Sequence, residues 1–103
     1  MLFRSGGQNT AVGNYTLYNN NADENTAVGY EAMFSNTSGT RNVAVGEGAL
    51  KANTTATNNT AVGYQALIAN TAASCIAVGM KALDANTTGV QNVGLGEIGR
   101  AHV

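Results

Sequence analysis

The chain has 103 residues, of which 44% are hydrophobic and 11% are charged, and its formal net charge is −1. A charged fraction far below the usual quarter, with almost no net charge, gives no basic surface that would attract nucleic acid. No apolar run approaches the roughly 18 residues of a membrane-spanning helix, so we expect neither a nucleic-acid partner nor insertion into a membrane. The single cysteine, Cys75, excludes an internal disulfide.

One short motif recurs along the chain. The pentapeptide Asn-Thr-Ala-Val-Gly starts at residues 9, 25 and 59, and variants of it start at residues 42, 75 and 92. The glycines that end these motifs are 16 or 17 residues apart. A fixed period of this kind is typical of solenoids, in which each repeat is one structural unit. We therefore expect residues 1–97 to form one repeat array that is incomplete at both ends.

The motif predicts a short β-strand. In each copy a β-branched residue, a small residue and a second branched residue precede the glycine, which is a period of two. We expect the branched pair to form the core and the opposite face, of alanine and glycine, to allow a close approach. In chain order the expected strands are residues 10–12, 26–28, 43–45, 60–62, 76–78 and 93–95.

The second half of each repeat predicts a corner, a second short strand and an outer corner. A leucine or methionine stands four residues after the glycine, and an asparagine stands seven residues after it. All one-residue changes in period fall between this asparagine and the next motif. Exposed loops tolerate insertions, whereas packed strands do not. The two columns are Leu17, Met33, Leu50, Leu67 and Leu83, and Asn20, Asn36, Asn53, Asn70 and Asn86.

These elements indicate an all-β fold, a parallel β-solenoid or β-roll. One unit cannot bury its own apolar face, so successive units stack, at a rise of about 4.8 Å. Equivalent residues then lie above one another, and asparagine amides can bond along the stack. Glycine at the strand end permits a corner with positive φ. An array of short helices is the alternative, but about seven residues between glycine and asparagine are too few for a stable helix.

The expected core of each repeat is thin. It contains about three sizeable apolar side chains, each stabilising the fold by roughly 2 kcal/mol, while ordering the backbone costs roughly 1 kcal/mol per residue. We therefore expect an oligomer, and most plausibly a trimer, that buries further surface. The candidate contacts between copies are the alanine and glycine face and Tyr15, Tyr30 and Tyr64.

The repeats resemble those of phage and prophage tail-fibre proteins and, more distantly, the head repeats of trimeric autotransporter adhesins. The resemblance rests on the stretches 25–30 and 59–64, with Ala32-Met33, Asn36-Thr37-Ser38-Gly39, Ala66 and Leu67. It implies a left-handed parallel β-roll and a homotrimer in an attachment fibre of a virion or a bacterial surface. Other parts of such a fibre bind the cell-surface glycan or protein receptor. Adhesin repeats are shorter and richer in serine, so the tail-fibre interpretation is favoured.

Residues 98–103 depart from the repeat, with Gly99 and Arg100 where alanine and leucine are expected. The segment can be written with the codons ATC GGA AGA GCA CAC GTC, which match a common sequencing adapter. We therefore expect that the segment is not native; a divergent capping repeat is the alternative. Residues 1–3 align with residues 32–34, inside a repeat, so we expect the chain to be an internal part of a longer fibre.

No group of residues predicts a catalytic, cofactor or metal site, and we expect no enzymatic activity. His102 belongs to the doubtful segment 98–103, and Cys75 replaces asparagine in a corner column without a partner base. The carboxylates fall at corner or outward positions, and Asp23-Glu24 lacks the acidic spacing of a calcium loop. These carboxylates are Asp23, Glu24, Glu31, Glu47, Asp84 and Glu97.

A ligand-binding solenoid is the alternative to a purely structural role, and ice binding is its most specific form. A column of threonines would present hydroxyl groups at the spacing of stacked strands. This column lies beside the loop of variable length, which disturbs a flat surface. Its members are Thr37, Thr54, Thr71 and Thr87.

Overall fold

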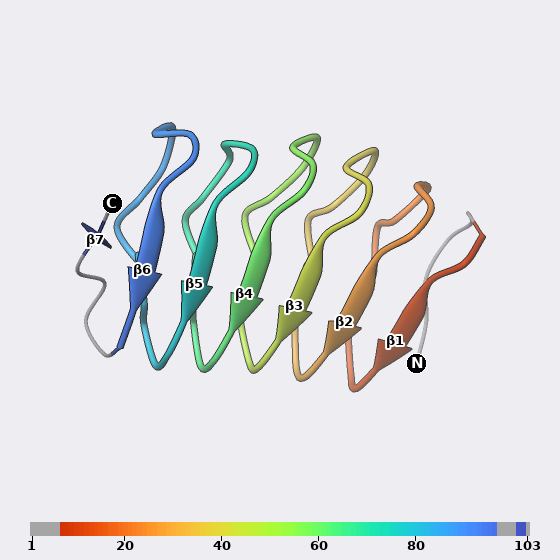
Figure 1. Cartoon of the computed structure of the whole chain (residues 1–103). Coiled ribbons are helices and arrows are strands. Elements are labelled where there is room, and N and C mark those ends of the chain that lie inside the picture. Colours follow the sequence, from red (N-terminus) through yellow and green to blue (C-terminus); the bar gives the residue numbers. More distant parts are fainter. Residues whose placement is uncertain (1–6, 97–100, 103) are drawn as a thin grey trace.

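The computed structural model describes residues 7–96 and 101–102 and is a parallel β-solenoid. Each coil contributes one short strand to a single sheet and returns through a loop on the opposite side (Figure 1). Among the described residues there is no helix, and a two-residue strand β7 (Ala101–His102) pairs antiparallel with β6. The parallel strands follow in chain order: β1 (Thr10–Val12), β2 (Thr26–Val28), β3 (Val43–Val45), β4 (Thr60–Val62), β5 (Ile76–Val78) and β6 (Val93–Leu95). Residues 98–100 and 103 of the segment expected to be non-native lie outside the described residues.

The register of the sheet confirms the columns of the sequence. Ala44 pairs with Ala27 on one side and with Ala61 on the other, and Val45 pairs with Val62. The pairing stays in register because the five- and six-residue stretches that change the period lie in the outer corners, between the late asparagine and the next motif. Equivalent residues of successive repeats therefore lie next to one another along the whole array.

The strands face the opposite way from the expectation. The central alanine of β1 to β5 is at most 2% exposed, whereas Val12 is 54% exposed and Val78 is 41% exposed. The prediction that the branched pair forms the core is wrong, and so is the prediction that the alanine and glycine face meets other copies. The coil is narrow: a Cβ built on Gly94, in the alanine column, would lie 2.5 Å from Leu83 Cγ. Only a small residue fits between the strand and the leucine column.

The return half of each coil is a series of turns, so the predicted second strand is wrong. In the second coil the N–H groups of Ala32, Phe34 and Asn36 each donate to the carbonyl three residues earlier. Glu31 and Met33, the third residues of the first two turns, have φ of 59° and 52°, and a positive φ is incompatible with an extended strand. The leucine column is nonetheless buried, as predicted, with 5% exposure or less.

The glycine that ends each strand forms the predicted corner. Gly46 has a φ of 131°, and a Cβ built on it would lie 2.5 Å from the carbonyl oxygen of Gly63 in the next coil. This position therefore needs glycine both for its backbone conformation and for the close approach of neighbouring coils. The same two constraints apply to Gly29 and Gly63.

Candidate functional surfaces

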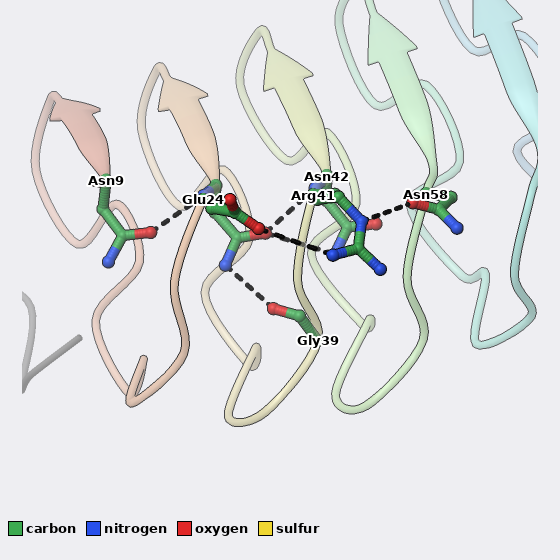
Figure 2. A network of polar contacts seen from close by, with 7 residues as sticks. Asn9, Glu24, Gly39, Arg41, Asn42 and Asn58 are labelled. Atoms are coloured by element: carbon green, nitrogen blue, oxygen red, sulfur yellow. Dashed lines mark hydrogen bonds and ion pairs between the residues drawn. The ribbon is translucent and has the colours of Figure 1, made fainter. Parts of the chain in front are cut away.

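The interior of the solenoid contains a column of asparagines that links each coil to the next. Asn25, Asn42 and Asn59, the first residues of their motifs, are buried, and Asn9 is half-buried. The side-chain oxygen of each accepts a hydrogen bond from the backbone N–H of the equivalent residue one coil further on. These bonds are 2.9 Å for Asn9 to Asn25, 3.0 Å for Asn25 to Asn42 and 2.9 Å for Asn42 to Asn59. Figure 2 shows the first two of these contacts, which join Asn9 and Asn42 to the coil between them. The predicted bonding between asparagines is thereby confirmed.

A second asparagine column shares its hydrogen-bond acceptors with the first. The amide of Asn53 donates to Ala56 O at 3.1 Å, and the amide of Asn42, at the start of the same repeat, donates to the same oxygen at 3.0 Å. In a five-residue corner the acceptor is two residues after the late asparagine, as in Asn70 to Ala72, instead of three. Corners of both lengths thus present one carbonyl to two amides, and this explains why a change of one residue leaves the stack intact.

Cys75 occupies an asparagine position and reproduces only part of this pattern. Its thiol is buried and lies 3.2 Å from Gly89 O, the carbonyl that an asparagine amide would reach. Its own backbone N–H donates to Asn59 Oδ1 at 2.8 Å. Among the described residues the thiol makes no hydrogen bond with the N–H of Asn92, so the side-chain link to the next coil ends here. The prediction that Cys75 replaces asparagine in a corner is confirmed.

The outer strand face, formed by the first and third residues of β1 to β6, is a regular surface that the coils share. Its side chains are threonine, valine, isoleucine and leucine, and none of them is charged. Val62, Ile76 and Leu95 are 36%, 43% and 55% exposed. Sequence analysis placed these side chains in the core, because alternation shows that a strand has two faces but not which face is inside.

Aromatic side chains gather on the turns of the first two coils. The rings of Tyr18 and Phe34 are stacked, with centroids 5.4 Å apart and planes 3° apart. Tyr15 meets Tyr18 and Tyr30 edge to face, at centroid distances of 5.4 Å and 6.0 Å. Tyr15, Tyr30 and Tyr64 are all exposed, so their contact with other copies stays a prediction.

The charged residues of the described part of the chain lie on the turns and outer corners. Lys51 Nζ is 2.8 Å from Glu31 Oε1, and this hydrogen bond is the main cause that raises the pKa of Lys51 above its ordinary 10.5, while slight burial acts in the opposite direction. Arg41 lies between Glu24 and Asn58 of the neighbouring coils, at 3.5 Å and 3.2 Å (Figure 2). Both pairs connect adjacent coils on the surface.

The candidate site residues from the sequence do not come together. Among the described residues, no group of three histidine, cysteine, aspartate or glutamate side chains could hold a metal ion. Asp23 accepts a 2.6 Å hydrogen bond from the backbone N–H of Gly7, which is a local corner contact. Glu97 and the side chain of His102 lie outside the described part of the chain.

The threonine column considered for ice binding is exposed, but two of its hydroxyl groups form hydrogen bonds within the protein. The hydroxyl of Thr37 bonds to Thr54 O at 3.2 Å, and that of Thr71 bonds to Thr87 O at 3.0 Å. These hydroxyls therefore serve the stack as well as the solvent.

Comparisons with models of protein families, with curated proteins and with solved structures gave no match. In the described residues no helix has the length and hydropathy that a membrane crossing requires. The resemblance to tail-fibre repeats rests on the motifs of the sequence and stays a prediction.

Proposed function

We propose that this chain is a structural segment of a trimeric fibre that attaches a virion or a cell to a surface, as in phage tail fibres. The observation that carries the proposal is the continuous register of β1 to β6, which pair in parallel, each with the strands of the adjacent coils. Such an array grows in one dimension, because each added repeat extends the rod without changing the coils already in place. The extents of 35 × 21 × 17 Å already describe an elongated body.

The apolar outer strand face supports an assembly of several copies. A protein that acts alone rarely exposes a large contiguous apolar surface. Here valine, isoleucine and leucine lie on one face from β1 to β6; they are exposed in β1, β4, β5 and β6 and half-buried in β2 and β3. The number three comes from the resemblance to tail-fibre repeats. A bacterial adhesin head is the closest alternative, since it uses the same kind of rod for the same purpose.

Sedimentation equilibrium over a wide range of dilution tests the assembly. We expect a mass three times the chain mass of 10.5 kDa, and electron micrographs of unbranched rods. A monomer at every concentration would contradict the proposal. Separating a phage origin from an adhesin origin needs the full gene: flanking tail-assembly genes would support the former.

Ice binding is the second candidate, and the outer strand face favours it. Thr10, Thr26 and Thr60 stand beside a valine column that runs from β1 to β5, and β-branched side chains hold their hydroxyl and methyl groups rigidly. Thermal hysteresis of the purified monomer would support this candidate. A trimer without thermal hysteresis would leave the fibre proposal alone.

A further inference from the structure

In the proposed fibre, on which this inference rests, one face of the solenoid meets the other copies. Three sides of the coil reach solvent: the outer strand face, the turns and the outer corners. The turns carry the Lys51–Glu31 pair, and the outer corners carry the Arg41–Glu24 pair. Charged side chains are depleted at the centres of protein interfaces, so only the outer strand face has the composition of such a centre.

We propose that three copies of this chain pack through their outer strand faces around an axis parallel to the solenoid. Val12, Val45 and Val62 of each copy then lie at the same height as the identical residues of the other two. A three-fold axis has no translation along its length, so the copies are parallel and in register by symmetry.

The spacing of the side chains explains why the partner is another copy. The valine column advances by one strand at each coil, as the pairing of Val28, Val45 and Val62 shows. A partner of any other fold would match this spacing at a few coils at most, whereas a second solenoid of the same rise matches it at all of them. The contact then repeats along the rod, and a small apolar gain per coil accumulates with length.

The stiffness of the face favours the same contact. Valine, threonine and isoleucine have one strongly restricted torsion each, so their immobilisation costs less conformational entropy than that of long side chains. Of the strands that carry them, β2 to β5 are held by parallel pairing on both sides. The surface is therefore already in its bound form in a single chain.

Disulfide trapping tests the assignment. In a Cys75→Ser background, single variants Val12→Cys and Val45→Cys place a thiol on the face, and Thr55→Cys places one on an exposed outer corner. Each protein is oxidised at a concentration where sedimentation shows the assembly, and the products are separated on a non-reducing gel. We expect covalent dimers from Val12→Cys and Val45→Cys, with about one chain in three left single because three thiols cannot all pair, and no dimer from Thr55→Cys.

Orientation is tested by mixing Val12→Cys with Leu95→Cys. A parallel assembly gives a dimer from Val12→Cys alone, whereas an antiparallel one gives dimers only in the mixture and would overturn the proposal. An intact assembly in which Thr55→Cys cross-links and the valine positions do not would also overturn it, while leaving the fibre function standing. A monomer at all concentrations would contradict both the packing of the strand faces and the fibre function.

Discussion

The side-chain oxygen of Asn42 accepts a hydrogen bond of 2.9 Å from the backbone N–H of Asn59, one coil further along the solenoid. Both asparagines are buried, so this bond is shielded from water. It ties a side chain of one repeat to the main chain of the next, at the point where the chain enters a strand. The motif therefore begins with asparagine for a structural reason: its amide also reaches the carbonyl of Ala56.

Replacing Asn42 with alanine should lower the free energy of unfolding by about 2–3 kcal/mol, because the buried N–H of Asn59 loses its acceptor and unsatisfied buried groups cost about 1–3 kcal/mol. Urea unfolding followed by circular dichroism measures the change. The control is Asn14→Ala, because Asn14 is exposed and is not among the residues with a positive φ. A loss as large for Asn14→Ala would contradict the special role of the buried column.

Replacing Cys75 with asparagine should stabilise the protein by about 1 kcal/mol, the usual net value of one hydrogen bond. The new side chain would continue the column by accepting from the N–H of Asn92 and donating to Gly89 O. The control, Cys75→Ser, retains a donor but is too short to reach the next coil, and it should give no gain. Equal midpoints of urea unfolding for the asparagine variant and the parent chain would contradict the prediction.

The sequence predicts the stack and its register from the columns alone. Ala44 pairs with Ala27 and Ala61, as the fixed distance of each from the motif glycine requires. The asparagine bonds also follow from the columns, because equal residues at equal positions must meet in a stack. The outer corners were located by the one-residue changes in period.

Two features could not be predicted, for physical reasons. Alternation gives a strand two faces, and residue size suggested that Val45 was inside, but the leucine column fills the narrow coil and admits only Ala44 beside it. The turns were missed because Glu31 and Met33 adopt a positive φ, which glycine or asparagine ordinarily signals. The stack imposes these conformations, so a single repeat carries no sign of them. Because Val45 and its equivalents were expected inside, the sequence did not predict the apolar outer strand face.

Replacing Gly46 with alanine should destabilise the solenoid by about 2–4 kcal/mol, within the range of strained and overpacked sites. The new methyl group would lie 2.5 Å from Gly63 O, at a φ of 131°. The control is Gly7→Ala, where a Cβ would approach only Asp23 Oδ1, at 4.0 Å. Thermal unfolding of the two variants measures the difference, and similar midpoints would show that the coils can separate without cost.

Replacing Gln65 with glycine should raise stability by up to about 1 kcal/mol. Gln65 has a φ of 55°, and the equivalent residue of the preceding coil is Gly48, with a φ of 72°. The left-handed conformation is less favourable by about 1–2 kcal/mol for residues other than glycine. Glycine removes this cost, but its greater flexibility in the unfolded chain cancels about 0.5–1 kcal/mol of the gain. Gln65→Val should instead lower stability, because β-branched residues tolerate this conformation worst. A urea midpoint that is higher for Gln65→Val than for Gln65→Gly would contradict the proposed strain at this position.

The Lys51–Glu31 pair should make stability depend on pH at the alkaline end. The pKa of Lys51 is raised above 10.5 in the folded chain, chiefly by its hydrogen bond to Glu31. A raised lysine pKa means that the folded state holds the proton more tightly than the unfolded state. The stabilisation is therefore complete below pH 10.5 and disappears as the pH rises through the raised value. Because the Lys51 side chain is 41% exposed, solvent screening limits the effect to about 0.2–1 kcal/mol.

The measurement is the difference in unfolding free energy between the parent chain and Lys51→Gln, from pH 8 to pH 12. The difference should be constant at first and shrink above pH 10.5, where both chains carry a neutral residue at position 51. Lys81→Gln is the control, because Lys81 forms no ion pair with a described residue. A difference that grows with pH would show that the charge of Lys51 destabilises the coil, which would contradict the contact with Glu31.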